Sequence, residues 1–288
     1  MRSQSAMEYL MTYGWAILAI AIVMVSLYSL GIFNTGNLTP TATPGSCQVI
    51  RTPAQTGLAG QCGNLIPKYV GQFNWARSSE VKLGSYPGYT SLTRSVWFYL
   101  SGPTTTHQFA IGSAGNGCCN YRIGILSGGT RLAIDPGNSN DQYSASNVLA
   151  YKQWYNVVVT AQNNGSSITY AVYLNGTQIT MGTGSTSGSI QSISEFCIGS
   201  GNSCGSEYFN GSIANVQIYN TSLDSGSVES LYQEGIGGAP IDLQHLVAWY
   251  PLNGNTNDYS GNNHNPDSGN VVNLNWNANW QSGYSNPS

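Results

Sequence analysis

Carboxylates are the side chains that most often carry hydrolysis, and in this sequence they stand apart from one another. The chain has 12 acidic residues among 288. Glycoside hydrolysis needs two carboxylates flanking the scissile bond, whereas the acidic residues of the central region are isolated: Glu80, Asp135, Asp141, Glu195 and Glu207. A His-Glu-x-x-His pair and a phosphate-binding loop are also missing. We therefore expect a protein that is not an enzyme.

Cysteines form the second chemical signal, at positions Cys47, Cys62, Cys118, Cys119, Cys197 and Cys204. None has a histidine at zinc-site spacing, and the adjacent pair lacks the two-residue gap of a metal or redox motif. An even number of cysteines beyond a membrane segment indicates disulfides. The spacing alone leaves the connectivity open. We favour Cys47–Cys62, with Cys118 and Cys119 paired against Cys197 and Cys204.

Five Asn-x-Ser/Thr sequons mark acceptors for N-glycosylation, at Asn37, Asn164, Asn175, Asn210 and Asn220. Several are expected by chance in a chain this rich in asparagine, serine and threonine. Asn175 also precedes Gly176 between two expected strands, where it is needed for a tight turn. The sequons therefore predict acceptors and not their occupancy.

The composition is typical of secreted all-β surface proteins. Charged residues make up only 7% of the chain, against about 25% in ordinary globular domains. Nine scattered lysines and arginines cannot supply the basic surface that nucleic acid requires, so we expect no nucleic-acid partner. An aromatic content of 11% is too high for a disordered chain.

From about Leu65 onward, short alternating runs separated by turn residues predict the strands of a β-sandwich. The expected strands cover residues 79–83, 93–100, 108–113, 121–126, 131–135, 154–161, 168–174, 177–181, 194–198 and 211–219. Asn175-Gly176 predicts a type I′ hairpin between two of them. A helical pattern is confined to residues 224–234, with Asp224 or Ser225 as its cap.

Three ordered motifs resemble laminin G-like (LamG) jelly rolls, relatives of the concanavalin A-like lectins and glucanases. They are Arg-Ser-Val-Trp-Phe-Tyr-Leu at 94–100, Trp-Tyr-Asn-Val-Val-Val-Thr at 154–160 with Ala-Val-Tyr-Leu-Asn-Gly at 171–176, and Phe-Asn-Gly-Ser-Ile-Ala-Asn-Val-Gln-Ile-Tyr-Asn at 209–220. The resemblance implies an all-β antiparallel jelly roll over residues 61–237. It also implies a face that binds a glycan or another protein.

Some LamG-type domains bind calcium through carboxylates and carbonyls at the sandwich rim. In this chain Asp258 and Asp267, which lie in asparagine-rich loops, are the candidate ligands, with Asp135 and Asp141 as alternatives. We favour the simpler interpretation that these side chains form loop turns, and expect no other cofactor.

The C-terminal residues 238–288 resemble the opening of a LamG domain, placed at its end. Leu-Val-Ala-Trp-Tyr-Pro-Leu-Asn-Gly at 246–254 and Asp-Tyr-Ser-Gly-Asn at 258–262 carry the resemblance. So short a segment cannot bury a second core. We therefore expect it to complete the same sandwich beside residues 213–220, with Trp249, Tyr250, Trp276 and Trp280 largely buried. The alternative is an exposed fragment of a second repeat.

The N-terminal part predicts a helix over residues 4–33 and an extended linker rich in glycine, threonine and proline over 34–60. No charged residue occurs between Glu8 and Arg51. Residues 9–33 as a helix would span roughly 37 Å, which exceeds the ~30 Å core of a bilayer. The simplest interpretation is an uncleaved membrane anchor.

The string from Arg2 to Glu8 resembles the class III signal peptide of archaeal type IV pilin-like proteins. The resemblance implies cleavage of a three-residue leader between Ser3 and Gln4. It also implies that Glu8 pairs with the new α-amino group of a neighbouring subunit, because a carboxylate among apolar helices needs a partner.

Together these patterns predict a single-pass surface protein with its sandwich outside the cell, anchored in the membrane or assembled with like subunits. It would present a LamG-like domain for adhesion through a glycan or a surface protein. The alternatives are a structural filament or envelope subunit without a dedicated ligand and, less favoured, a secreted glycan-degrading enzyme.

Overall fold

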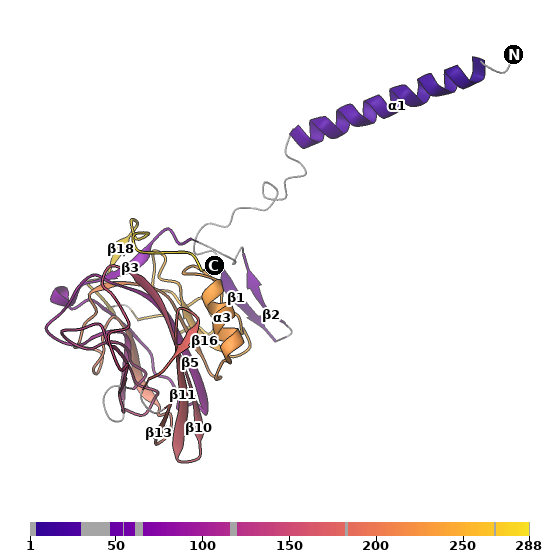
Figure 1. Ribbon diagram of the computed structural model, residues 1–288. Helices are drawn as coiled ribbons and strands as arrows, with labels where there is room; N and C mark the ends of the chain where they lie inside the picture. The colour runs from indigo at the N-terminus through magenta and orange to yellow at the C-terminus, as the bar shows by residue number, and fades with distance from the viewer. Residues whose placement is uncertain are drawn as a thin grey trace. The chain divides into compact units, whose positions relative to one another are not determined.

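The computed structural model describes residues 4–29, 47–53, 55–60, 66–115, 120–181, 184–267 and 269–287 (Figure 1). The chain divides into two compact units, Met1–Ala42 and Thr43–Ser288. We describe each unit by itself.

The N-terminal unit contains one helix, α1 (Gln4–Ser29), which includes the predicted assembly residue Glu8. Ser3 and residues 30–33 lie outside the described residues. Along α1 large apolar side chains are exposed, among them Trp15 and Val25. Within the described part of the chain, no helix combines the length and hydropathy of a membrane-spanning segment.

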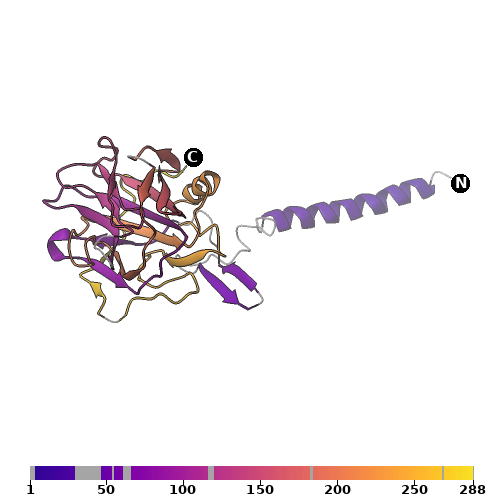
Figure 2. The same cartoon turned by 90° about the horizontal axis from the view of Figure 1, so that it is seen from below.

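The second unit is an all-β sandwich of two antiparallel sheets, as expected from the sequence (Figure 2). The larger sheet has the strand order β12-β11-β10-β5-β15-β3-β18, with β13 also on β11 and β16 also on β15. The smaller sheet has the order β17-β4-β14-β6-β7-β8-β9, and β1 and β2 form a separate hairpin. The strand order of the two sheets in the second unit fits a lectin-like jelly roll.

The strand bounds follow the expected runs closely in the central region. The strands are β1 (Gln48–Thr52), β2 (Gln55–Ala59), β3 (Val70–Phe73), β4 (Glu80–Leu83), β5 (Ser91–Leu100), β6 (Gln108–Gly115), β7 (Ile123–Ile125), β8 (Leu132–Ile134), β9 (Gln142–Tyr143), β10 (Trp154–Asn164), β11 (Ser167–Leu174), β12 (Thr177–Ile179), β13 (Ser185–Ser187), β14 (Ile193–Ile198), β15 (Gly211–Tyr219), β16 (Leu246–Tyr250), β17 (Val271–Val272) and β18 (Asn275–Asn277). A 3-10 turn, η1 (Trp75–Arg77), and the helix α3 (Ser225–Gln233) complete the elements.

The turn between β11 and β12 is the predicted type I′ hairpin. Asn175 has φ 49° and Gly176 has φ 75°, and Leu174 pairs with Thr177. Positive φ at both central positions matches the right-handed twist of the flanking strands. The prediction from the Asn-Gly dipeptide is confirmed.

Alternate residues of β5 face two different apolar clusters. Val96 and Phe98 pack between the two sheets, in the main core. Trp97 lies on the outer face of the larger sheet, in a cluster with Trp154 and Trp280. Because both faces are covered, the strand is buried along nearly its whole length.

The helix α3 covers part of that outer face (Figure 1). Asp224 caps α3 by accepting a hydrogen bond from the Ser227 backbone N–H at 2.8 Å. Of the two caps predicted, Asp224 and Ser225, the structure therefore has Asp224. Val228 and Leu231 of α3 pack with Val158 of β10. The helix therefore docks on the sheet through its apolar side.

The C-terminal segment contributes strands to both sheets. β16 pairs antiparallel with β15, with Ile218 opposite Ala248. β18 pairs with β3 (Figure 1), and β17 pairs with β4. Trp249, Tyr250 and Trp280 are buried. Trp276, which we expected to be largely buried, is only half-buried because β18 lies at the sheet edge.

Residues 48–59 are not the extended linker that we expected. They form the β1–β2 hairpin, and Val49 of β1 is buried. Arg51 fixes the hairpin to the C-terminal segment by donating to the carbonyls of Leu243, Leu246 and Ser260, at 2.6, 2.8 and 3.1 Å. The apolar and charged positions of β1 thus have partners that are distant in sequence.

One disulfide corrects the predicted pairing. Cys197 bonds to Cys204, seven residues along the chain, so neither can pair with Cys118 or Cys119. These two cysteines lie outside the described residues. Cys47 is also disulfide-bonded, but Cys62, its predicted partner, is outside the described residues too.

Deleting residues 238–288 is expected to abolish cooperative folding of the sandwich. The deletion removes β16 from β15 and exposes outer-face side chains that Trp249 and Trp280 now cover. Size-exclusion chromatography and thermal unfolding would report aggregation without a two-state transition. A matched deletion of residues 1–42, the other compact unit, should leave the transition in place. A soluble, cooperatively melting 1–237 chain would contradict this account.

Candidate functional site

Three hollows lie on the described surface of the sandwich. The edge pocket, about 290 Å³, lies between β11 and β12. The aromatic pocket, about 310 Å³, lies on the outer face of the larger sheet. The serine-rimmed hollow, about 570 Å³, is lined by Ser85, Tyr86, Pro87, Gly115, Ser192, Ile193 and Ser194.

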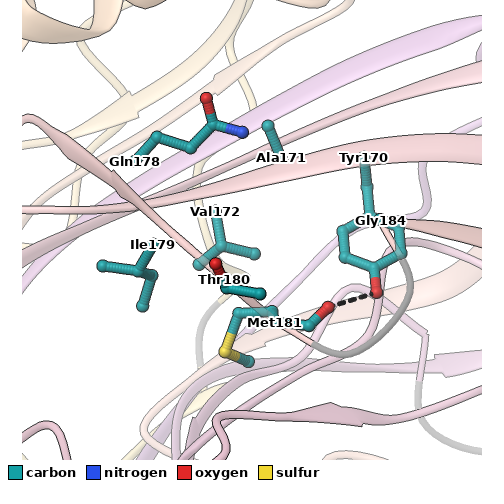
Figure 3. A pocket seen from close by; sticks show the side chains of 8 residues that line it. All are labelled: Tyr170, Ala171, Val172, Gln178, Ile179, Thr180, Met181 and Gly184. Carbon is teal, nitrogen blue, oxygen red and sulfur yellow. Dashed lines mark hydrogen bonds between the residues drawn. The ribbon is translucent and has the colours of Figure 1, made fainter.

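The edge pocket has few groups available for a polar ligand (Figure 3). Val172, Ile179 and Met181 are its larger aliphatic lining residues, and Val172 and Met181 are buried. The Tyr170 hydroxyl donates to the Met181 carbonyl at 2.7 Å, the dashed line in Figure 3. The side chains of Gln178 and Thr180 are exposed polar groups of the lining. The edge pocket therefore presents a single ring, Tyr170, whose hydroxyl is already engaged within the protein.

The aromatic pocket combines rings and amides from five separate parts of the chain. It is lined by Trp97, Lys152, Gln153, Trp154, Tyr155, Asn175, Tyr232, Gly283, Tyr284 and Ser285. These residues come from β5, the start of β10, the β11–β12 turn, α3 and the C-terminal segment. The pocket exists only because α3 and the C-terminal segment meet over the sheet.

The rings of the aromatic pocket hold one another in place. Tyr232 stacks on Trp97 with centroids 5.7 Å apart and planes 17° apart. Tyr284 meets Trp97 edge-on at 5.7 Å. Its hydroxyl accepts a hydrogen bond from the Ile236 backbone N–H at 3.2 Å. Offset and edge-on contacts of this kind stabilise aromatic clusters beyond simple burial. The walls are therefore pre-organised.

The C-terminal segment approaches β10 so closely that only glycine fits. Gly283 has φ 75°, and a Cβ there would lie 2.3 Å from the Lys152 carbonyl oxygen. Its own carbonyl accepts a hydrogen bond from the Trp154 N–H at 3.1 Å. The Trp154 indole donates to the Trp280 carbonyl at 2.9 Å. These contacts fix the floor and one rim of the pocket.

The charge of the aromatic pocket is close to neutral. Among the described residues that line it, Lys152 alone carries a formal charge. Burial raises the pKa of the Tyr232 and Tyr284 hydroxyls, so both stay protonated at physiological pH. Gln153 and Ser285 are exposed at the rim. The pocket offers neutral donors and acceptors next to flat apolar rings.

Two carboxylates that appear isolated in the sequence meet in the fold on the smaller sheet. Asp141 and Glu207 both form ion pairs with Arg122, and the Glu207 contact is 3.2 Å. The Arg122 guanidinium lies over the Phe109 ring, 4.7 Å from its centroid. The Tyr143 hydroxyl donates to Asp141 at 3.2 Å. No sequence spacing indicated this cluster, because its members are far apart along the chain.

Asp135 lies inside the sandwich with a buried arginine. Arg94 is fully buried and donates to the Asp135 carbonyl at 2.7 Å. Its guanidinium lies over the Tyr121 ring, 5.4 Å from the centroid. Burial lowers the pKa of Arg94 to about 10 and raises the pKa of the Asp135 carboxyl. Asp135 is therefore an interior group rather than a rim ligand.

Asp258 organises a loop of the C-terminal segment. Its Oδ1 accepts from the backbone N–H groups of Trp249 and Ser260, both at 2.9 Å. Its Oδ2 accepts from the Ser260 hydroxyl at 2.8 Å and the His264 N–H at 2.9 Å. At Asp267, the backbone carbonyl accepts from the Asn270 N–H at 3.1 Å. Among the described residues, no three His, Cys, Asp or Glu side chains gather as a metal site.

The predicted glycosylation acceptors differ in accessibility. Asn164 and Asn220 are exposed, and Asn210 is half-buried. Asn175 is half-buried in the wall of the aromatic pocket. Asn37 lies outside the described residues. The fold therefore separates two open acceptors from one that borders a pocket.

The comparison with family models shows which superfamily the chain belongs to. A laminin G-like model of the concanavalin A-like lectin/glucanases superfamily matches residues 74–229, more than half of the sequence. The chain belongs to this superfamily. The expected LamG-like resemblance is confirmed over this range, and no curated protein matches the chain.

Several solved structures align with this chain at low sequence identity. A candidate carbohydrate-binding protein from Bacteroides ovatus ATCC 8483 aligns with TM-score 0.53 and 15% identity, over 79% of this chain and 65% of its own. This chain thus spans slightly under two thirds of that relative. A heptameric SAP-like pentraxin from Limulus polyphemus gives TM-score 0.44 and 16% identity over 65% of this chain and 93% of its own. The tailspike protein 2 of bacteriophage CBA120 aligns with TM-score 0.48 and 15% identity, over 75% of this chain and 33% of its own.

Sequence reasoning placed Trp97 and Trp154 in strand motifs of this superfamily domain and gave no binding role to them, to Tyr232 or to Tyr284. The signal that could have identified the outer-face ring of Trp97 is the alternation of side chains between the two faces of β5. Trp97 has the opposite parity along β5 to the core residues Val96 and Phe98. An aromatic residue on the outer face of a central strand indicates that something covers it.

Replacing Asp258 by alanine is expected to lower the free energy of unfolding by about 1–3 kcal/mol, because buried donors lose their acceptor. The loss should be equal in calcium and in EDTA. Thermal or urea unfolding measures it, and Asp267→Ala serves as the control with little effect. A calcium-dependent stabilisation of the wild type that disappears in Asp258→Ala would contradict the turn role.

Proposed function

We propose that this protein binds glycans through the aromatic pocket. The observation that carries the proposal is that the partly exposed ring of Tyr232, held in place by stacking on the buried Trp97, lines the same pocket as the exposed amide and hydroxyl groups of Gln153 and Ser285. Ligand sites in general are concave and mostly apolar, with a few polar groups that set orientation. A sugar ring presents an apolar C–H face and a rim of hydroxyls. The two kinds of surface match.

The size and charge of the pocket narrow the ligand. A volume of about 310 Å³ is at the low end for small-molecule sites, which favours one or two sugar units at the end of a chain. The lining has no carboxylate and one cation, Lys152. This favours neutral or anionic sugars over cationic ligands, although aromatic walls alone would also attract a cation.

The comparisons support a carbohydrate ligand. The superfamily is described as one of lectins and glucanases, and the Bacteroides ovatus structure is described as a candidate carbohydrate-binding protein. Both descriptions concern those proteins, and at 15% identity the shared property is the fold. For this chain the pocket itself is the argument.

We favour binding over hydrolysis. Retaining and inverting glycosidases need two carboxylates free to act at one bond. Asp141 and Glu207 are instead both engaged by Arg122, and neither lines the aromatic pocket. Release of reducing sugar from a polysaccharide would overturn this part of the proposal.

Tyr232→Ala is expected to weaken glycan binding about tenfold, equivalent to ~1.4 kcal/mol, because it removes the ring that stacks on Trp97. Isothermal titration with an oligosaccharide selected on a glycan array measures the change. The matched control is Tyr143→Ala, a partly exposed tyrosine of β9 on the other sheet. A loss in Tyr143→Ala with none in Tyr232→Ala would place binding elsewhere. Melting curves of both variants exclude unfolding as the cause.

We further propose that the N-terminal helix displays the sandwich at the cell surface, in a membrane or in a filament of like subunits. The support is the charge-free stretch between Glu8 and Arg51 and the exposed apolar side chains of α1. Such a surface is costly in water and calls for an apolar partner.

Processing of the leader makes this second proposal testable. Intact mass and N-terminal sequencing of protein from native cells are expected to give a mature start at Gln4. Cell fractionation should then recover the protein with membranes or filaments. An intact Met1 start would contradict processing. Recovery of the protein only in the soluble fraction would contradict anchoring.

A further inference from the structure

One lining residue of the aromatic pocket is also a glycosylation acceptor. Asn175 opens the sequon Asn175-Gly176-Thr177 and borders the pocket. Its Oδ1 accepts a hydrogen bond from the Asn156 N–H at 2.9 Å, which fixes the carboxamide. Its Nδ2 makes no hydrogen bond to the described part of the chain. The nitrogen that would carry a sugar is therefore held at the pocket and remains available.

The rest of the sequon is placed to match. Thr177 is exposed at the start of β12. A Cβ at Gly176 would lie 2.9 Å from the Tyr232 ring, so the turn rests directly against the wall of the pocket. A sugar on Asn175 starts next to the rings without any change in the backbone.

The other described acceptors lack this setting. Asn164 lies at the opposite end of the β10–β11 hairpin, Asn220 follows β15, and Asn210 precedes it. None of them lines one of the three hollows. Among the described sequons, Asn175 alone borders one of these three hollows.

We infer that Asn175 is N-glycosylated and that the first sugars of this glycan occupy the aromatic pocket of the same chain. The inference rests on the proposed function, since it assumes that the pocket accepts sugar rings. The Nδ2 atom forms a bond to the anomeric carbon of a lipid-phosphate-linked oligosaccharide. The bond from that carbon to the phosphate oxygen breaks, the phosphate leaves with the electron pair, and Nδ2 gives up one proton to a base.

A covalent link changes the binding equilibrium of the pocket. A short tether gives an effective concentration in the millimolar range, so a sugar–ring contact with a Kd of about 0.1 mM or below is largely formed within the chain. A free glycan must then displace the attached one. The protein glycosylated at Asn175 should bind free oligosaccharide at least tenfold more weakly than the unmodified protein.

The test uses the full chain purified from its native cells in three forms. Thr177→Ala removes the sequon and keeps Asn175 with its hydrogen bond. Ser166→Ala, the matched control, removes the Asn164 sequon at the far end of the same hairpin. Peptide mass mapping reports occupancy. The probe for binding is the N-glycan released enzymatically from the wild-type protein.

The expected result is an occupied Asn175 and at least tenfold tighter binding of the released glycan by Thr177→Ala than by wild type, with Ser166→Ala like wild type. Contacts between the Asn175 glycan and the Trp97 or Tyr232 ring in nuclear Overhauser spectra should accompany it. An unmodified Asn175, equal binding by wild type and Thr177→Ala, or no sugar–ring contacts would overturn the inference.

The two proposals fail in different ways. If Thr177→Ala binds other array glycans at the pocket but the wild-type glycan makes no contact with the rings, only the inference fails. A second outcome is that no free glycan binds Thr177→Ala while the glycan attached to Asn175 of the wild type contacts the rings. The pocket then binds only the attached glycan, and the proposal of an external glycan ligand is wrong. If no free glycan binds and the attached glycan makes no contact with the rings, both the proposed function and the further inference are wrong.

Discussion

The central strands of the larger sheet are apolar on both faces, and the rest of the fold follows from the need to cover the outer one. Val96 and Phe98 of β5 are buried against the smaller sheet, while Trp97 on the same strand faces outward. At roughly 25 cal/mol per Å² of apolar surface, an exposed layer of tryptophans would be strongly unfavourable. The helix α3 and the C-terminal segment provide the cover. The aromatic pocket is the place where these two covers meet and do not close completely.

A single bulged residue ties the two covers to the sheet. Asn215 interrupts the β5–β15 register and has φ 48°. Its amide donates to the Gly238 carbonyl at 3.0 Å, just beyond α3, and its Oδ1 accepts from the Trp249 indole at 2.8 Å. A bulge of this kind redirects a side chain at a defined point of a strand. Here Asn215 joins β15 to the segment after α3 and to β16. The geometry of the pocket therefore depends on polar contacts of Asn215, which does not line the pocket.

Local patterns predicted the parts of this structure that depend on local physics. Alternation located β5, β10, β11 and β15, the Asn175-Gly176 dipeptide specified its turn, and Asp224 marked the start of α3. The disulfide was predicted wrongly, because Cys197–Cys204 depends on how the loop after β14 folds back and not on the count of cysteines. The pocket was not predicted either. Its lining residues lie far apart in the sequence, and only the tertiary arrangement brings the partly exposed Tyr232 and Tyr284 together with the buried Trp97 and Trp154.

The central claim is that the cover of the outer face forms the glycan site. The most direct measurement is a titration of the isotope-labelled, unglycosylated chain with an array-selected oligosaccharide, followed by the indole N–H signals of its seven tryptophans. The account predicts that the Trp97 and Trp154 signals shift together with the backbone signals of residues 152–155 and 283–285. Shifts confined to the edge pocket around Tyr170 and Met181, or to the Arg122 cluster on the other sheet, would contradict it.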